Sequence, residues 1–324
     1  MTSVSKFFLT IAATVCLTAY SQSTSTDDGS RRLTVLAWNV WHEGHARTYG
    51  QQACDGTIGI LRQSGADVIL MVETYGTSHQ VADSLGYYHR LLSSNLCIYS
   101  RYPIVKTYTF PDSISTFNFG GVEIDIDGIP VHIFDTWIHY LPDERLVPIG
   151  QSEAEILAWE NSGTRDEETR SILSVLQPMI AQTDSIPIII GGDFNSHSHL
   201  DWTEATKDLY NHGGAVVDWT VSRMMADAGF SDSFRELNPD PVKNIGTTWL
   251  TDADSLETPN RSDRIDFIYY RGATIHPVES QCYDNLLGKP FDFMGRTFFY
   301  PSDHGFVLTV FELTPGVKSR PAAK

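Results

Sequence analysis

The sequence predicts a layered α/β domain with substantial antiparallel pairing, and three observations lead to this fold class. Short apolar runs bounded by glycine, proline and aspartate recur along the chain, and only a few amphipathic helical segments separate them. Strands arranged as meanders, rather than in strict alternation with helices, favour antiparallel pairing. Hydrophobic residues make up 41% of the 324 residues, enough for a full core.

Residues 1–21 are expected to form a secretory signal peptide. Lys6 precedes a short apolar run, and Ala19-Tyr-Ser21 fits a small-x-small cleavage site. The apolar run is shorter than the ~20 residues that span a bilayer. Residues 22–32 form a polar spacer, which makes an N-terminal core element the weaker alternative. The protein is therefore expected to be secreted or periplasmic, with a lipid anchor on Cys16 as a minority alternative.

The first elements follow from apolar runs and the glycines that end them. After the spacer, an apolar strand is expected over 33–39 and a helix over 51–63. A second apolar strand over 67–73 has an acidic residue at its carboxyl end, and a short helix is expected over 78–85.

A run of short strands is expected next, separated by turn signals such as Arg101-Tyr-Pro103 and Asp127-Gly-Ile-Pro130. These strands cover residues 87–92, 96–100, 104–110, 121–126 and 131–138. The segment 141–163 has no regular pattern, whereas 165–182 has apolar residues at helical spacing.

The last elements complete one domain over residues 33–314, followed by a tail over 315–324. A hydrophobic strand over 186–190 runs into the polar sequence Gly191–Ser196, and a helix is expected over 221–228. Late strands are expected over 264–270 and 306–311. No repeat or linker divides the chain, so a single domain is sufficient.

The charge and the cysteines limit the function classes. The chain has 40 acidic and 23 basic residues and a net charge of -17, which argues against binding nucleic acid through a broad basic face. An enzyme that binds phosphate through a metal ion is still compatible with this net charge. Cys54, Cys97 and Cys282 allow one disulfide and a free thiol, or no disulfide, and the lack of a CxxC pair gives no indication of a thiolate metal cluster.

Polar residues recur at the ends of the predicted strands, where one rim of packed sheets can bring them into one pocket. They are Asn39, Glu73, His139, Asp193, Asn195, Asp266 and the sequence Ser302-Asp303-His304. Carboxylate and amide oxygens are the ligands that Mg²⁺ prefers, and histidines can donate hydrogen bonds to a phosphate. Each residue alone is typical of a turn or a surface, so the combination carries the interpretation.

Through these strand-end residues and the motifs around them, the chain resembles the endonuclease/exonuclease/phosphatase superfamily with its deoxyribonuclease-I-like fold, over nearly all of residues 33–312. The motifs that carry the resemblance, in the order of the family, are Trp38-Asn39, Val72-Glu73, Ser100–Ile104, the strand end at His139, Gly191-Gly-Asp-Phe-Asn-Ser196, Thr248-Trp249, Arg264-Ile-Asp-Phe-Ile268 and Ser302-Asp-His304. The resemblance implies a four-layer α/β/β/α sandwich with two packed mixed sheets. It also implies hydrolysis of a phosphoester with Mg²⁺ or Mn²⁺.

The resemblance assigns metal-binding roles to three positions. Glu73 resembles the principal metal ligand of the family, with Asn39 and Asp303 near the metal. A metal would supply the positive charge that phosphoryl chemistry needs and that this acidic chain otherwise lacks.

The resemblance also implies the catalytic residues. Asp193 corresponds to the group that orients or deprotonates the attacking water, and Asn195 to one that holds the water or a phosphate oxygen. Asp266 would orient His304, and His304 and His139 would contact the phosphate. One departure concerns His139. The family often has Asn-Thr-His-Leu on this strand, whereas this chain has Asp135-Thr-Trp-Ile-His139.

Several further polar residues near these motifs are candidates for substrate binding: His42, His45, His197, His199 and Arg264. The segment 41–45 is either a substrate-contacting loop or a polar surface loop. His197 and His199, with Asp201, could form a second metal site or a leaving-group pocket, but hydrogen bonding that braces Asp193 and Asn195 is favoured. Arg264 could contact phosphate or form an ordinary salt bridge.

The sequence therefore predicts a secreted, metal-dependent phosphoesterase. The scattered basic residues favour a phosphodiester, or a phosphomonoester, on a small-molecule or lipid-derived substrate. A secreted nuclease is the alternative, so nucleic acid is possible as a substrate but is not favoured. A non-catalytic binding protein on the same fold is less favoured, because every matched family position holds a chemically competent residue.

Overall fold

The computed structural model describes residues 29–249 and 263–315. The predicted signal peptide, most of the polar spacer and nearly all of the predicted tail lie outside the described residues. Among the helices of the described ranges, none combines the length and apolar character needed to cross a bilayer.

Two six-stranded sheets form the centre of the fold. The first has the order β11-β14-β1-β2-β4-β3, with β1 (Arg31–Asn39), β2 (Val68–Val72), β3 (Tyr88–Leu91), β4 (Leu96–Ser100), β11 (Ile275–Tyr283) and β14 (Phe306–Leu313). The second has the order β5-β6-β7-β8-β10-β9, with β5 (Ile104–Thr107), β6 (Phe119–Ile126), β7 (Ile129–Trp137), β8 (Ile188–Asp193), β9 (Ser231–Asp232) and β10 (Asp266–Arg271). Each sheet contains one parallel pair, β1 with β2 and β7 with β8, so both sheets are mixed.

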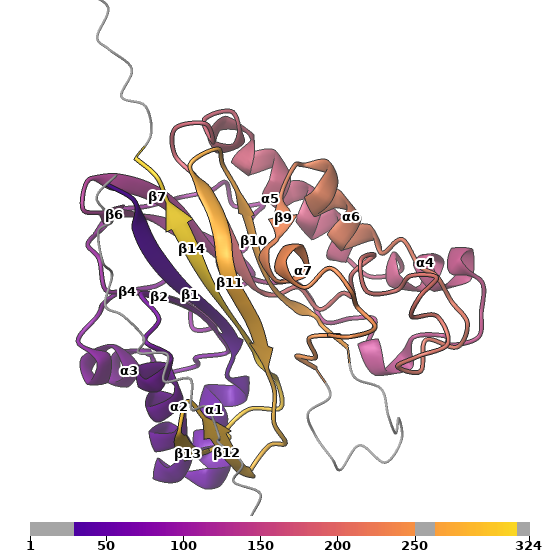
Figure 1. Ribbon diagram of the computed structural model, residues 1–324, viewed down its shortest axis with the longest axis horizontal. Helices are drawn as coiled ribbons and strands as arrows, with labels where there is room; N and C mark the ends of the chain where they lie inside the picture. The colour runs from indigo at the N-terminus through magenta and orange to yellow at the C-terminus, as the bar shows by residue number, and fades with distance from the viewer. Residues whose placement is uncertain (1–28, 250–262, 316–324) are drawn as a thin grey trace, which may run out of the picture.

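Helices flank the two sheets (Figure 1). Those beside the first sheet are α1 (Trp41–Tyr49), α2 (Gln51–Ser64) and α3 (Ser78–Leu85). Those beside the second are α5 (Arg165–Ile180), α6 (Thr220–Asp227) and α7 (Ser233–Leu237), the last also packing on β11. The helix α4 (Glu153–Glu160) lies farther from the sheets and packs in a separate apolar cluster with Trp202 and Trp219 (Figure 1). A 3-10 turn, η1 (Glu144–Leu146), precedes α4, and a hairpin of β12 (Pro290–Phe293) and β13 (Arg296–Phe299) packs on α2.

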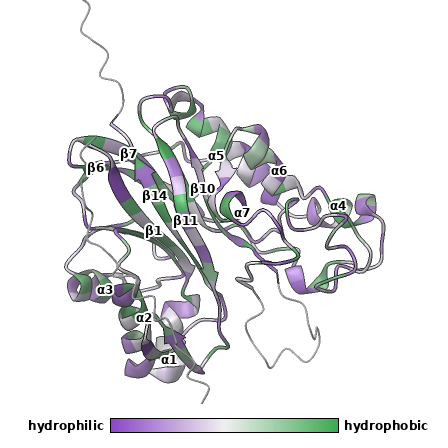
Figure 2. Ribbon diagram, in the orientation of Figure 1, coloured by the Kyte–Doolittle hydropathy of each residue, from purple (hydrophilic) through white to green (hydrophobic). Residues whose placement is uncertain are grey.

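Three apolar clusters hold these layers together. One lies between the sheets and includes Val35 and Ile133. A second joins the outer face of the first sheet to α2 through residues such as Ile60, and a third joins the second sheet to α5 through residues such as Leu176. Figure 2 shows that α5 and α6 each carry both hydrophobic and hydrophilic residues, as expected of helices that bury one face. The predicted four-layer α/β/β/α sandwich is confirmed.

Most elements form near their predicted positions, and the helix Ser78–Leu85 and the strand Leu96–Ser100 have the predicted bounds. Among the described residues, three α-helices (α1, α4 and α7) and four strands (β9, β11, β12 and β13) were not predicted. The segment predicted as a loop over 41–45 begins α1, where Trp41, His42 and Glu43 have φ values of 44, 47 and 66° and form a left-handed turn. Such a turn has no apolar periodicity that could reveal it.

The other differences also have local causes. Within 141–163, α4 begins with a capping box between Ser152 and Glu155, a signal that apolar periodicity alone does not detect. The strand β11 contains Pro277, which lies at a bulge and weakens the strand pattern. Strand β1 begins at Arg31, two residues inside the predicted spacer. In the described part of the structure, Cys54, Cys97 and Cys282 are free thiols.

Candidate active site

Five polar side chains from both sheets meet at one end of the sandwich. Asn39 ends β1, Glu73 follows β2, Asp193 ends β8, Asp266 begins β10 and His304 precedes β14. Because β1 and β2 are parallel, Asn39 is the register partner of the residue before Glu73. Because β8 and β10 are antiparallel, Asp193 is the register partner of Asp266. We call these five residues the strand-end cluster.

The Asn39 amide connects the two sheets. Its Nδ2 donates to Glu73 Oε1 at 3.2 Å and to Asp193 Oδ2 at 3.0 Å, and its Oδ1 accepts from the Trp41 N–H at 2.9 Å. In this geometry Asn39 sets the spacing of two carboxylates. Its predicted contact with a metal would require the amide to turn its oxygen towards the ion, and this role stays a prediction.

His304 lies among carboxylates. Its Nδ1 is 3.0 Å from Asp266 Oδ2, and its Nε2 is 4.0 Å from both Asp193 Oδ2 and Asp303 Oδ1. Burial alone would lower the pKa of His304, but Asp266 and the neighbouring carboxylates raise it to about 10. The imidazole is therefore protonated at neutral pH, and both of its nitrogens are donors.

The site carries more buried carboxylates than His304 can neutralise. Burial raises the pKa of Asp193 to about 7, with a further contribution from Asp266. Burial also raises the pKa of Asp303 to about 7, with a further contribution from Glu73. A divalent cation would relieve this repulsion, and hard oxygen donors fit Mg²⁺ or Mn²⁺.

The ligand atoms that lie closest together differ from the predicted set. Asp193, Asp266 and His304 each place a possible ligand atom within 4.8 Å of the others. The predicted ligands were Glu73, Asn39 and Asp303. The residues present therefore have ligand atoms suited to a metal ion. Two of them, His304 and Asp266, are however already hydrogen-bonded to each other.

Glu73 is held in an unusual backbone conformation. Its φ of 61° lies in the left-handed region, which costs a non-glycine residue about 1–2 kcal/mol. Asn95 Oδ1 accepts from the Glu73 N–H at 3.1 Å, and Glu73 Oε2 accepts from the His42 N–H at 3.0 Å. Strained residues of this kind concentrate at functional sites. No sequence signal singles out Asn95, which looks like an ordinary turn residue between strands.

Asn195 supports Asp193 from the other side. Its φ is 47°, and its backbone N–H donates to Asp193 Oδ1 at 2.8 Å. Its Nδ2 donates to the Ile138 carbonyl at 2.8 Å and to Asp193 Oδ2 at 3.1 Å. Asp193 therefore has a fixed orientation before any substrate binds.

Two residues of the quoted motifs have supporting roles that the sequence did not specify. Ser302 Oγ donates to the Asn39 carbonyl at 2.7 Å and accepts from the His304 N–H at 2.9 Å. Thr248 Oγ1 accepts from the Asp266 N–H at 3.1 Å. Both hydroxyl groups fix the backbone that carries the strand-end cluster.

His139 lies beyond the end of β7. The register partner of Asp193 on β7 is Trp137. The His139 ring lies 6.1 Å from the Trp137 ring and 5.0 Å from the Tyr140 ring, and its N–H donates to Glu168 Oε2 at 3.2 Å. Among the described contacts, none connects the His139 ring with Asp193, so its contact with phosphate stays a prediction.

The structure corrects two predicted substrate contacts. Arg264 is 1% exposed, and its guanidinium lies 2.9 Å from Asp201 and 2.6 Å from Asp232. His197 is also 1% exposed, with Nε2 2.6 Å from Glu144 Oε2. Both side chains are enclosed by ion pairs that join loops to the second sheet, so neither reaches a substrate. The described polar contacts of His197 are with Glu144 and Asp263, and its predicted bracing of Asp193 and Asn195 stays a prediction.

The remaining predicted substrate contacts lie in different places. His42 is exposed, and its ring stacks on Tyr75 at 5.7 Å. His45 lies on α1, and its side chain is outside the described part of the structure. His199 is half-buried, with Nδ1 2.8 Å from Ser222 Oγ on α6, which makes it a local structural contact.

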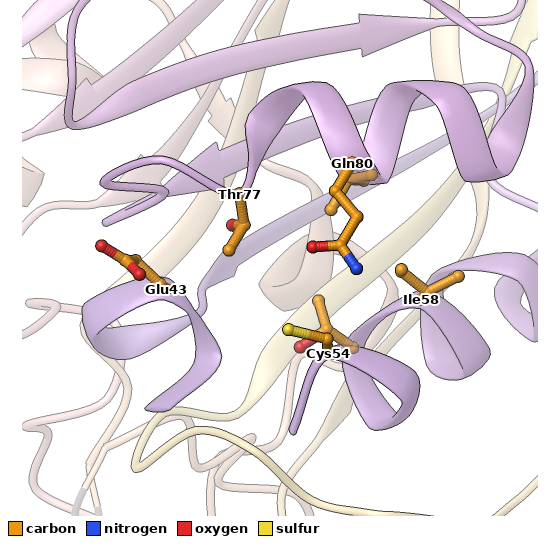
Figure 3. A pocket seen from close by; sticks show the side chains of 7 residues that line it. Glu43, Cys54, Ile58, Thr77 and Gln80 are labelled. Carbon is orange, nitrogen blue, oxygen red and sulfur yellow. The ribbon is translucent and has the colours of Figure 1, made fainter. Parts of the chain in front are cut away.

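A small pocket lies between α1, α2 and α3, beside the turn that contacts Glu73. It is lined by Glu43, Cys54, Thr57, Ile58, Thr77, Gln80 and Val81, and Gln80 extends towards Cys54 (Figure 3). Burial, with a contribution from Asp55, raises the pKa of the Cys54 thiol. The thiol is therefore protonated at neutral pH and unsuited to act as a nucleophile.

Comparisons of sequence and structure relate this chain to known proteins. Residues 36–304 match the model of a family described as the Endonuclease/Exonuclease/phosphatase family. The chain is 30% identical over 326 residues to the uncharacterized protein F14F9.5 of Caenorhabditis elegans, covering 92% of this chain and 95% of that protein.

Two solved structures share the fold at low identity. Zebrafish (D. rerio) TDP2 complexed with a single-strand DNA product has a TM-score of 0.59 and 15% identity, over 86% of this chain and 98% of that one. An AP endonuclease from Archaeoglobus fulgidus has a TM-score of 0.57 and 17% identity, over 86% of this chain and 99% of that one.

Proposed function

The chain belongs to the endonuclease/exonuclease/phosphatase family, and from this premise we propose that it hydrolyses phosphodiesters at the strand-end cluster. It is a metal-dependent phosphoesterase of the phosphoric ester hydrolase class. The observation that carries the proposal is the gathering of Asp193, Asp266 and Asp303 around a protonated His304, with Glu73 joined to Asp193 through the Asn39 amide. Such a site can hold a divalent cation and present a cationic donor to a phosphate.

We propose Mg²⁺, with Mn²⁺ as the alternative, held by Glu73 and Asp303. His304 is a poor ligand because its pKa of about 10 keeps it protonated at neutral pH. Asn39 would join the ligands by turning its amide oxygen towards the ion. When bound, the cation neutralises phosphate charge and stabilises the charge that develops during phosphoryl transfer.

The side chains then divide the remaining work. Asp193 accepts a proton from the attacking water, held for this by Asn39 and Asn195. A pKa near neutrality suits a general base. His304 donates from Nε2 to a phosphate oxygen, while Asp266 bonds to Nδ1 and keeps the ring charged and oriented.

We propose that the substrate is a small-molecule or lipid-derived phosphodiester. Arginines near the site strands are committed inside the protein, because Arg264 pairs with Asp201 and Asp232, and Arg165 pairs with Glu144. They are buried and unavailable to neighbouring phosphates of a polymer. A substrate held mainly through one phosphate fits this arrangement best.

A nuclease activity is the second candidate. The observation that favours it is the fold shared with TDP2, of which one structure contains a single-strand DNA product. The net charge of -17 weakens this candidate, because non-specific binding of nucleic acid depends on cationic contacts.

We further propose that the protein is exported. The support is the sequence of residues 1–21, with its short apolar run and small-x-small site. Expression of the full chain in a bacterial host, followed by N-terminal sequencing of the exported protein, tests this. Cleavage near Ser21 is expected, and an uncleaved protein retained in the cytoplasm contradicts it.

A substrate panel with and without EDTA tests the proposed activity. The panel contains small phosphodiesters, sphingomyelin, phosphomonoesters and plasmid DNA, each with Mg²⁺ or Mn²⁺. We expect metal-dependent hydrolysis of a small phosphodiester or of sphingomyelin. Plasmid degradation faster than hydrolysis of every small ester would overturn the substrate assignment in favour of the nuclease.

A further inference from the structure

A continuous strip of aromatic rings runs from α1 to the loop after β7. It consists of His42, Tyr75, Phe117, Trp137 and Tyr140, and we call it the aromatic strip. Successive ring centroids are separated by 5.7, 6.4, 5.6 and 6.2 Å. All five side chains are at least partly exposed, with Tyr140 47% exposed. Large aromatic groups that are contiguous and solvent-accessible are typical of binding surfaces.

The backbone of the strip is attached to the strand-end cluster. The His42 N–H donates to Glu73 Oε2, and Tyr75 follows Glu73 by two residues. The Phe117 carbonyl accepts at 2.9 Å from Asn95, the residue that holds the Glu73 backbone. These contacts place the first three rings beside the predicted metal ligand.

The other end of the strip lies beside the predicted base. Trp137 is the register partner of Asp193 on the neighbouring strand, and Tyr140 follows three residues later. The strip therefore borders the site from Glu73 to Asp193. A phosphodiester bound at the cluster would bring one of its substituents onto these rings.

We propose that the aromatic strip binds a planar aromatic group attached to the scissile phosphodiester, an inference that rests on the proposed function. Histidine, tyrosine and tryptophan offer ring faces for stacking together with polar edges. This combination suits a flat ring, such as a nucleobase or another aryl group, better than a flexible alkyl chain. Of the exposed aliphatic side chains among the described residues, Leu141 and Leu146 follow Tyr140 in the chain, beyond the end of the strip.

The charged side chains near the aromatic strip favour a phosphodiester substituent that carries no charge. Arg145 lies in the loop beyond Tyr140, but its guanidinium is bound to both oxygens of Asp143 at 2.9 and 3.1 Å. Arg165 bonds to the Tyr140 carbonyl and is buried. These arginines hold the loop together, so ring stacking, rather than pairing with further phosphates, accounts for recognition at the strip.

The experiment compares esters that differ only in the planarity of one group. Benzyl methyl phosphate and cyclohexylmethyl methyl phosphate have alkyl ester bonds of similar reactivity and substituents of similar size. Octyl methyl phosphate represents an alkyl chain. Products are measured by mass spectrometry for the wild type, for Phe117→Leu and Tyr75→Leu, and for the control Tyr88→Leu. Tyr88 is exposed on β3, at the end of the sheet away from Glu73.

For the wild type, kcat/KM for the benzyl ester should exceed that for the cyclohexylmethyl ester about fivefold or more. In Phe117→Leu or Tyr75→Leu this ratio should fall towards one, and in Tyr88→Leu it should keep the wild-type value. Equal rates for the benzyl and cyclohexylmethyl esters in the wild type overturn the proposal. A preference for the octyl ester also overturns it and assigns the strip to an alkyl chain.

A binding measurement separates this proposal from the proposed function. If the wild type hydrolyses none of the three esters with Mg²⁺ or Mn²⁺, while other phosphodiesters also fail, the proposed function is wrong. Saturation-transfer NMR with benzylphosphonate and cyclohexylmethylphosphonate then tests the strip alone. Stronger transfer to the benzyl group that is lost in Phe117→Leu supports an aryl site, and equal transfer to both ligands overturns it.

Discussion

Asp135 is a carboxyl group buried between the two sheets, and its replacement by asparagine is expected to stabilise the protein at neutral pH. The side chain is 0% exposed, and neither carboxyl oxygen makes a hydrogen bond of normal length and angle. Burial raises the pKa of Asp135 well above its usual value of 3.8, and the backbone N–H groups of Thr136, Cys97 and Met71 oppose this shift only in part. Ionisation of Asp135 therefore opposes folding.

The sign and size of the effect follow from proton linkage. Because the pKa is raised in the folded state, the folded protein has its full stability below about pH 4 and loses stability as the pH rises towards the folded-state pKa. The loss is about 1.4 kcal/mol per pH unit for one group. Asparagine does not titrate, so the stability of Asp135→Asn relative to the wild type should increase by that amount per pH unit.

Urea unfolding followed by tryptophan fluorescence, with EDTA present throughout, measures this difference at several pH values between about 4 and 8. The pH dependence of the difference isolates Asp135 from the carboxylates of the strand-end cluster, which titrate in both proteins. Asp112→Asn, at an exposed loop position, controls for the loss of one surface charge. A stability difference that stays constant with pH, or that moves in favour of the wild type as the pH rises, refutes this reasoning.

Three further predictions concern the site and its supports. Asp266→Asn removes the main source of the raised His304 pKa, so the alkaline limb of the pH–rate profile should move to lower pH. In the same variant kcat/KM should fall about 10²-fold or more. An unchanged alkaline limb contradicts this prediction. Asn95→Ala removes the acceptor for the Glu73 N–H, and calorimetry should show Mg²⁺ or Mn²⁺ affinity about 10–100-fold weaker, whereas wild-type affinity would exclude this support role. Ser152→Ala removes the capping box of α4 and should lower the free energy of unfolding by about 1 kcal/mol without affecting kcat/KM, and a loss of activity would connect α4 to the site.

The strand-end cluster could be predicted because its signals are local. Asp193 and Glu73 come directly after apolar runs, and the ends of adjacent strands meet once the sheet pairing is known. The short apolar runs and their turn residues likewise predicted a layered domain with antiparallel pairing, whereas the two mixed sheets followed from the family resemblance. Sequence pattern and spacing are sufficient to predict the place of a residue when that place depends only on the strand that contains it.

The remaining features depend on contacts between distant segments. Arg264 precedes a strand and resembles a phosphate ligand in sequence, but the fold places Asp201 and Asp232 around it. Asn95 is one of many polar turn residues, and only the pairing of β2 with β4 brings it to Glu73. The aromatic strip likewise joins five residues from separate segments, which no sequence period connects.

The central claim is that the strand-end cluster is the active site of a metal-dependent phosphoesterase with Asp193 as its base. The most direct test is kcat/KM of Asp193→Asn relative to the wild type, measured at saturating Mg²⁺ or Mn²⁺ on the best substrate of the panel. Asparagine preserves the size of the side chain and can still accept hydrogen bonds, but it cannot take a proton. A loss of about 10²–10⁴-fold with the fold intact is expected. Activity within about threefold of the wild type would show that Asp193 is not the base.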